Sequence, residues 1–249
     1  MSASKMVEKL SRRHPLQRLE SPSKGFSGVV HVFGLLIFYS DFKYLRDHPN
    51  FINDSYGWHL QYLTIIGLAL STLCFLSGLA SDITSSPTLF LLKNYLSLLA
   101  APLEILISLL YWTLLSISPS LVIPTTLPPL PLLNDLSFHL LPSLLLTLDT
   151  LLLSPPWPTA PMNPAAPVIT LVTSSVLSFA YWIWIEVCYA HNGFYPYPIF
   201  GLLDTWQRVG LFAFSGGMMC LVGAGLRAAY RLVNGMEGVG EMDAEKKRE

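Results

Sequence analysis

Polar and ionisable side chains that stand inside long apolar runs are the residues of this chain best suited to chemistry. A polar group in a hydrocarbon environment costs free energy, so its presence there favours a functional role. Seven residues of this kind occur in the 249-residue sequence: His31, Thr64, Glu104, Asp135, His139, Asp149 and Glu186. They include a hydroxyl that can attack a carbonyl carbon and imidazoles that can accept its proton, which is the minimum for nucleophilic catalysis.

Thr64 and His139 are the pair whose positions agree best. Thr64 lies near the start of the apolar run 60–80, and His139 lies near the start of the run 132–153. If both runs enter a membrane from the same side, a helical rise of ~1.5 Å per residue puts the two residues at depths of roughly 6 and 10 Å. A hydroxyl and an imidazole at such similar depths can meet as nucleophile and base.

Asp135 and His191 are the candidates for supporting roles. Asp135 precedes His139 by one helical turn, so the two side chains share a helix face and the carboxylate can orient the imidazole. His191 follows the apolar run 168–190, where it could line the mouth of a site. Asp135 and His139 could also ligate a metal, but two ligands do not make a site.

The sequence lacks the signatures of soluble hydrolases, metalloproteases and nucleotide-binding proteins, namely the G-x-S-x-G, H-E-x-x-H and P-loop strings. The three cysteines, Cys74, Cys188 and Cys220, stand in apolar stretches, where they are typical packing residues rather than disulfide or zinc ligands. We therefore expect neither a metal nor a cofactor.

The charge pattern indicates where these residues reside. Only 12% of the residues are charged, and the chain has no Lys or Arg between Lys93 and Arg208. A soluble domain carries about 25% charged residues, so this pattern predicts a polytopic membrane protein with the bilayer as its environment. The net charge of −1 provides no field for nucleic acid, and no nucleic-acid partner is expected.

Six apolar segments are long enough to position the polar residues across a bilayer. Each approaches the ~20 residues that a membrane-spanning helix needs, and they cover residues 25–42, 60–80, 95–117, 132–153, 168–190 and 206–226. The first is the weakest because it is short and contains His31, so five spans are the alternative. We predict an all-α bundle of about six transmembrane helices over 25–226, a basic tail at 1–24 and a charged tail at 227–249.

Basic residues predict the orientation of this bundle. With six spans, twelve basic residues fall on the side of the two tails, including Lys93 in a loop between the second and third spans. Only Lys43, Arg46 and Arg208 fall on the opposite side. The positive-inside rule then places both termini in the cytosol. His31 and His59 are interpreted as interfacial residues.

Three strings, taken in order, resemble one known family. They are Tyr56-Gly57 followed by Thr64 after six intervening residues, the set Tyr181, Trp184, Gly193, Tyr197 and Pro198, and Asn134 leading to His139. Their order and spacing over about residues 53–226 are similar to the androgen-induced protein, FAR-17a and androgen-dependent TFPI-regulating protein family. The run before His139 and the position of Pro142 depart from the family pattern, which puts the register of the fourth span in question.

The resemblance implies an activity and its residues. Members of that family are multi-pass membrane hydrolases that cleave the branched ester of fatty acid esters of hydroxy fatty acids with a threonine and a histidine. Carried over by position, the resemblance makes Thr64 the nucleophile and His139 the base. It also favours the endoplasmic reticulum, since the sequence shows no other address.

Two other functions fit parts of the sequence. Glu104 and Glu186 have no basic residue nearby in sequence, and unpaired carboxylates of this kind could line the path of a small transporter or channel. A non-catalytic membrane adaptor that acts through its charged tails is the other alternative.

Overall fold

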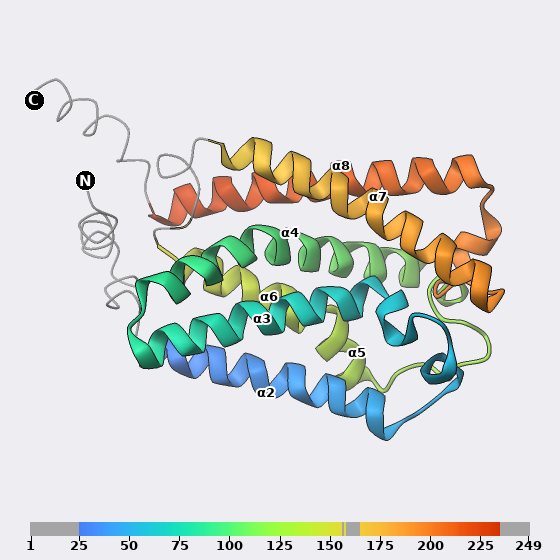
Figure 1. The fold of residues 1–249 in the computed structure, drawn as a ribbon, viewed down its shortest axis with the longest axis horizontal. Helices are drawn as coiled ribbons and strands as arrows, with labels where there is room; N and C mark the ends of the chain where they lie inside the picture. The colour runs from blue at the N-terminus through green and yellow to red at the C-terminus, as the bar shows by residue number, and fades with distance from the viewer. Residues whose placement is uncertain (1–24, 156, 158–164, 235–249) are drawn as a thin grey trace, which may run out of the picture.

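Long helices occupy the predicted apolar runs in the computed structural model, which describes residues 25–155, 157 and 165–234. Among these described residues, five helices are long and apolar enough to cross a membrane. They lie side by side with their long axes roughly aligned (Figure 1). These helices are α2 (Phe26–Asp47), α3 (Leu63–Thr84), α4 (Pro87–Ile117), α7 (Ala166–Asn192) and α8 (Thr205–Asn234).

The predicted fourth span is broken rather than continuous. It consists of α5 (Leu132–His139), α6 (Leu141–Leu148) and a π-helical turn, η5 (Asp149–Leu153), with a bend of 42° between α5 and the rest. Pro142 lies in the first turn of α6 and has no backbone N–H to continue the hydrogen-bond ladder of α5. The bend leaves His139 as the last residue of α5.

These helices confirm the predicted fold class. The chain is an all-α polytopic membrane protein, and its described part contains five candidate spans, or six if the bent pair counts as one. In the described ranges the remaining elements are short helical turns and the structure contains no strand. The turns are η2 (Phe51–Asp54), η3 (Trp58–Gln61), η4 (Pro119–Leu121) and η6 (Pro198–Leu202).

Local signals set the ends of two long helices. The Ser86 side chain accepts a hydrogen bond from the Leu89 N–H, and Pro87 occupies the first turn, so α4 begins there. At α8 the Asp204 carboxylate accepts from the Gln207 N–H and the Gln207 side chain accepts from the Asp204 N–H. This reciprocal pair is a capping arrangement, so Asp204 has a structural role.

Several helices extend beyond the apolar runs. Because α4 begins at Pro87, Lys93 lies inside this helix and is buried, and its predicted place in a loop is wrong. When Lys93 is no longer counted as a loop residue, the side of the two tails still has more basic residues than the opposite side. At the other end of the chain, α8 continues past residue 226 to Asn234. The expected tail 1–24 and the segment 235–249 lie outside the described residues.

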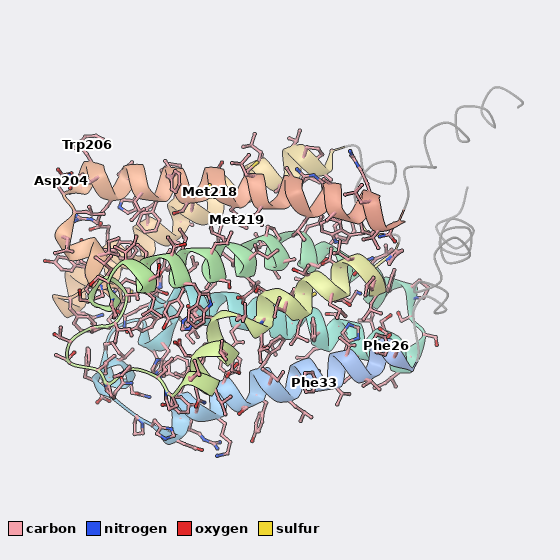
Figure 2. The ribbon with its side chains drawn as sticks, turned by 180° about the vertical axis from the view of Figure 1, so that it is seen from behind. Phe26, Phe33, Asp204, Trp206, Met218 and Met219 are labelled. Carbon is pink, nitrogen blue, oxygen red and sulfur yellow. The ribbon has the colours of Figure 1, made fainter. Side chains whose placement is uncertain are left out.

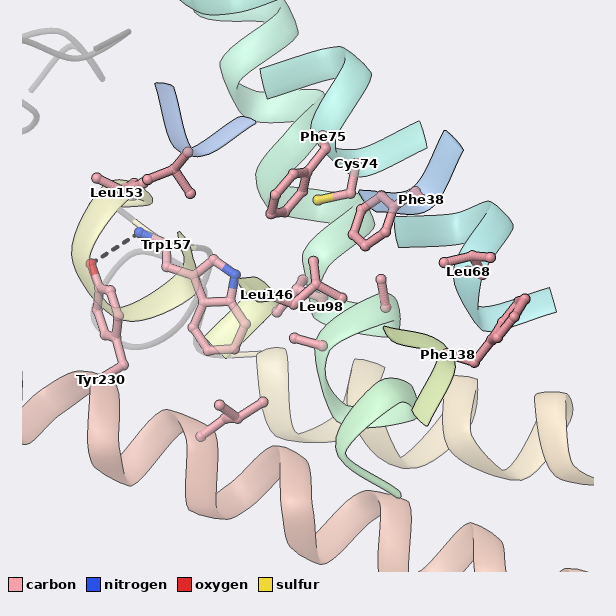
Figure 3. Packing of buried hydrophobic residues seen from close by; sticks show 14 of the residues in the cluster. Phe38, Leu68, Cys74, Phe75, Leu98, Phe138, Leu146, Leu153, Trp157 and Tyr230 are labelled. Carbon is pink, nitrogen blue, oxygen red and sulfur yellow. Dashed lines mark hydrogen bonds between the residues drawn. The ribbon is translucent and has the colours of Figure 1, made fainter. Parts of the chain in front are cut away.

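Apolar side chains of α2, α3, α4, α5, α6 and α8 form the main core. Phe38 of α2 packs with Phe75 of α3, and Leu98 of α4 and Leu146 of α6 belong to the same cluster (Figure 3). Trp157 joins this cluster to α8 because its backbone N–H donates to the Tyr230 hydroxyl over 3.0 Å (Figure 3). A second apolar cluster lies between α4 and α8 and comprises Leu103, Leu106, Ile107 and Met219.

The two ends of the bundle differ in their connections. The segments 48–62, 118–131 and 193–204 all lie at one end, which we call the loop end (Figure 1). The tight turn between α3 and α4, the starts of α2 and α7 and the last turn of α8 lie at the opposite end (Figure 1).

Candidate functional site

Thr64 lies at the loop end, in the first turn of α3, and is almost fully buried. Its Oγ1 is 3.4 Å from the hydroxyl oxygen of Tyr197, which precedes η6. Burial raises the pKa of Tyr197, so this phenol is neutral at physiological pH and can donate a hydrogen bond. A threonine hydroxyl and a neutral phenol therefore stand together at one position.

Side chains of α7 fix the backbone that leads into Thr64. The Tyr181 hydroxyl donates to the Gln61 carbonyl over 2.7 Å and accepts from the Leu63 N–H over 3.1 Å. The Trp184 indole N–H donates to the Leu60 carbonyl over 2.9 Å. These aromatic residues satisfy backbone groups at the start of α3, where intrahelical partners are lacking, and so they set the position of Thr64.

The Tyr-Gly string before Thr64 requires a glycine at position 57. Its φ of 84° is in the left-handed region, which favours glycine. A Cβ at this position would also lie 2.8 Å from the Cys188 Sγ of α7. The neighbouring Tyr56 exchanges two backbone hydrogen bonds with the Asn192 side chain, so the end of α7 and the segment before α3 are joined.

His139 forms a second group at the same end of the bundle. Its Nδ1 lies 2.9 Å from the Asp135 Oδ1, and its ring stacks on Tyr111 of α4 with ring centroids 3.5 Å apart. The Tyr111 hydroxyl donates to the same Asp135 oxygen over 2.6 Å. We assign the imidazole proton to Nδ1 from this carboxylate contact, which leaves Nε2 as the acceptor nitrogen.

The short helix that carries His139 is held from two sides. Tyr111 binds Asp135 from α4, and the buried Asp41 of α2 accepts a hydrogen bond from Ser137 over 2.6 Å. Within the described part of the chain, the His139 Nε2 has no hydrogen-bond partner. The imidazole is therefore oriented at one nitrogen and available at the other.

Thr64 and His139 do not contact each other directly. The Thr64 hydroxyl faces Tyr197, whereas the His139 ring packs against Tyr111, and no hydrogen bond joins the pair among the described residues. Tyr111 connects the two groups, because it lines the same cavity as Thr64 and stacks on His139 with its ring.

The cavity beside Thr64 has a volume of about 490 Å³, within the range of ligand sites. It lies between the start of α3 and the helices α4, α7 and α8. Leucine, isoleucine, methionine and phenylalanine side chains form most of its wall, and the lining includes no charged residue and no histidine. At the loop end its polar groups include Thr64, Tyr111, Tyr181 and Tyr197.

His191 lies on the surface, away from the cavity wall. It is exposed, stacks on the Tyr56 ring at 4.0 Å and contacts the Val187 carbonyl of its own helix. The structure thus brings Asp135 to His139 and Thr64 to the cavity, and it leaves His191 outside this group.

Tyr197, Tyr181 and Tyr111 are site residues that reasoning from single positions did not select. From the sequence, Tyr111 and Tyr181 are typical of packing residues, because their neighbours in sequence do not show where their hydroxyls form hydrogen bonds. Tyr197 belongs to the Tyr-Pro string in the loop after the fifth apolar run. That string is the feature of the sequence that indicates Tyr197 as a candidate site residue.

Glu186 differs from the expectation of an unpaired carboxylate, whereas Glu104 has no ion-pair partner among the described residues. Glu186 accepts from Arg208 over 2.7 Å and from the Tyr195 hydroxyl over 3.0 Å, so the expectation is wrong for this residue. Glu104 is buried and accepts from the Ser71 hydroxyl over 3.0 Å. Arg208 is distant from Glu186 in sequence, but the loop 193–204 returns the chain to bring α8 beside α7.

His31 and His59 are buried inside the protein rather than exposed on its surface. His31 is only 1% exposed and bridges Asp82 at 2.6 Å and Asp149 at 3.1 Å, near the end opposite Thr64. Lys93 pairs with the same Asp149 over 2.9 Å. His59 lies in the loop-end segment, where burial lowers its pKa.

Comparisons with known proteins place this helical membrane protein in a family. The sequence profile of the FAR-17a/AIG1-like proteins matches residues 26–231, and the chain belongs to this family. A protein of Schizosaccharomyces pombe described as a UPF0641 membrane protein is 43% identical over 158 residues, which are 63% of this chain and 68% of the relative. No solved structure matches. The match confirms the family predicted from the three strings.

Proposed function

We propose that this protein is an intramembrane hydrolase of lipid carboxylic esters, with Thr64 as the nucleophile, His139 as the base and Asp135 as the residue that orients the base. The carboxylate–imidazole pair beside a cavity that contains Thr64 is the observation that carries the proposal. A base held at one nitrogen and available at the other is the arrangement that nucleophilic hydrolases use.

The reaction proceeds in two steps. The Thr64 oxygen attacks the ester carbonyl carbon while His139 takes the hydroxyl proton, and the bond to the leaving oxygen breaks as His139 returns the proton to it. A water molecule then attacks the acyl-threonine and passes a proton to His139. The bond to Thr64 breaks, its oxygen regains the proton, and the fatty acid leaves.

Tyr197 stabilises the charge that develops on the carbonyl oxygen. Its neutral hydroxyl lies 3.4 Å from the Thr64 Oγ1, so a carbonyl under attack by Thr64 is within reach of this donor. Thr64 and His139 approach each other when the substrate is bound, since catalytic hydrogen bonds often tighten only in that complex.

Fatty acid esters of hydroxy fatty acids are the substrate class we propose. The resemblance implies this class, and an apolar cavity without charged residues suits the hydrocarbon part of such an ester. We also propose that the protein resides in the endoplasmic reticulum, which the resemblance favours. Both termini are in the cytosol, because the excess of basic residues is on the side of the two tails.

Fatty acid release from such an ester by detergent-purified protein tests the proposal. Thr64→Ala and His139→Ala are each expected to lower kcat by about 10³-fold or more, as for other nucleophile–base pairs. Thr72→Ala is the matched control, because Thr72 lies on the same helix and its hydroxyl bonds only the Leu68 carbonyl. Full activity in Thr64→Ala would overturn the assignment of the nucleophile. Failure of the wild type on a range of esters would overturn the hydrolase and favour the transporter alternative.

A further inference from the structure

We infer that the apolar cavity holds the acyl chain on the carbonyl side of the ester, and that Met219 at its deep end limits the length of this chain. The inference rests on the proposed function, and it adds the placement of the two halves of the substrate and a residue that sets specificity.

The cavity is long and runs along the helices. Its wall on α4 extends from Leu103 to Leu114, which corresponds to ~16 Å at ~1.5 Å per residue. Thr64 and Tyr197 lie at the loop end, whereas Leu103, Ser174 and Met219 lie farthest from it along their helices. Figure 2 shows Met219 near the middle of α8, well inside the bundle. A narrow space of this length suits an extended hydrocarbon chain.

The deeper wall offers one buried hydroxyl without a hydrogen-bond partner among the described residues, that of Ser174. Two hydroxyls in it are already used, since Ser178 donates to the Phe212 carbonyl and Ser215 donates to the Leu211 carbonyl over 2.9 Å. Among the described residues, the lining has no charged side chain. A charged lipid headgroup would lose its hydration there for a single hydroxyl partner, whereas an acyl chain has no such hydration to lose.

Two lining residues also face the surroundings of the bundle. Leu109 of α4 is 49% exposed and Phe214 of α8 is 59% exposed, and both belong to the cavity wall. In a membrane protein such exposed apolar side chains at mid-helix face lipid. An acyl chain can therefore enter sideways from the bilayer between α4 and α8 without crossing water.

The position of His139 decides which half of the ester enters the cavity. His139 is not among the residues that line the cavity, and its ring stacks on Tyr111, which does line it. The general acid must reach the leaving oxygen to protonate it. The hydroxy acid that carries this oxygen therefore lies on the side of His139, and the acyl chain extends from Thr64 in the opposite direction, into the cavity.

Met219 and Leu103 close the deep end. Met219 is 2% exposed and packs in the apolar cluster that contains Leu103. Each methylene that fits inside gains ~0.8 kcal/mol, which is about a fourfold change in affinity. A chain that reaches Met219 gains nothing from further carbons, so activity should rise with acyl length and then fall.

Opposite substitutions at Met219 test the inference in a series of esters. Met219→Trp shortens the cavity and should lower kcat/KM for the longest acyl chains by about tenfold or more relative to short ones. Met219→Ala lengthens it and should move the preferred acyl length upward. Varying the chain of the hydroxy acid should give the same profile in wild type and both variants. Opposite shifts cannot arise from a general folding defect.

Leu221→Trp is the matched control, because Leu221 lies on the same helix, is 65% exposed and is not part of the cavity wall. It should leave the length profile unchanged. An unchanged profile in both Met219 variants would overturn the inference. A shift in the preferred hydroxy-acid length instead would overturn the placement of the two halves.

A binding measurement separates this inference from the proposed hydrolysis. A fatty acid with a photoreactive group at its chain end should label the α8 peptide that contains Met219 in the Thr64→Val protein, which lacks the nucleophilic hydroxyl. Met219→Trp should abolish this label, and excess unlabelled fatty acid should compete with it. Labelling confined to other helices would overturn the cavity as an acyl-chain site, whether or not the wild type hydrolyses esters.

Discussion

At the scale of single residues, the arrangement around His139 explains how one imidazole can serve as a base inside a bundle. Asp135 accepts hydrogen bonds from Tyr111 over 2.6 Å and from the His139 Nδ1 over 2.9 Å. The carboxylate therefore fixes both the ring orientation and the tautomer. Tyr111 adds a stacking contact that restricts rotation of the ring.

Substitution of Asp135 tests this role. Asp135→Asn can keep a hydrogen bond to the ring but can also favour the wrong tautomer, so kcat should fall by about 10²–10⁴-fold with little change in KM. Steady-state kinetics on the proposed ester would show the split. Asp54→Asn, at the loop end but in η2, is a control that should retain activity. A rise in KM at constant kcat would assign Asp135 to substrate binding instead.

At the scale of elements, the start of α3 depends on α7 for its position. The hydroxyl of Tyr181 bonds one backbone group on each side of Tyr62, immediately before Thr64. The two helices are separate in sequence, and the segment 48–62 that precedes α3 is joined to the end of α7 through Asn192. Thr64 is thus placed by a neighbouring helix rather than by its own.

Removal of one hydroxyl tests this dependence. Tyr181→Phe keeps the ring in the cavity wall but leaves the Gln61 carbonyl and the Leu63 N–H without this partner. A displacement of Thr64 by ~1 Å should lower kcat by about 10²-fold. Tyr189→Phe removes a hydroxyl from a more exposed position on the same helix and should have little effect. Equal activity of the two variants in the ester assay would contradict the positioning role.

At the scale of the whole molecule, a buried charge cluster joins four elements at the end opposite Thr64. His31 of α2, Asp82 of α3, Lys93 of α4 and Asp149 of η5 are linked by contacts of 2.6–3.1 Å. Both ring nitrogens of His31 face carboxylate oxygens, so we assign a proton to each nitrogen and a positive charge to the imidazole. Two positive and two negative groups then balance in a buried site.

The cluster predicts a large effect on stability. Lys93→Met leaves the buried Asp149 without its ammonium partner, and the free energy of unfolding should fall by about 3–5 kcal/mol. Thermal unfolding in detergent would measure the change. The double variant Lys93→Met with Asp149→Leu removes both charges and should regain much of the loss. A single variant as stable as the wild type would show that the pair contributes no net stability.

The sequence by itself determined the fold class and the family, and it indicated three residues of the candidate site, Thr64, Asp135 and His139. Charge depletion and runs of about 20 apolar residues dictate helices that cross a bilayer, because neither signal depends on which helices become neighbours. The one-turn spacing of Asp135 and His139 likewise predicts a shared face from helix geometry alone. Pro142 is visible in the fourth run, but that run was predicted as one continuous span, and the 42° bend at the missing N–H of Pro142 is a finding of the structure.

Only the tertiary structure decided which polar groups pair. His31 pairs with two aspartates, and Glu186 pairs with Arg208. Lys93 lies inside a helix because α4 begins earlier than the apolar run. The roles of Tyr181 and Tyr197 also depend on contacts between distant segments. Helix packing sets these contacts, and packing is fixed by shape complementarity between faces that are far apart in sequence. The residues next to a charged side chain in sequence can show that it is buried at a cost in free energy. They cannot show which distant residue pairs with it and offsets that cost.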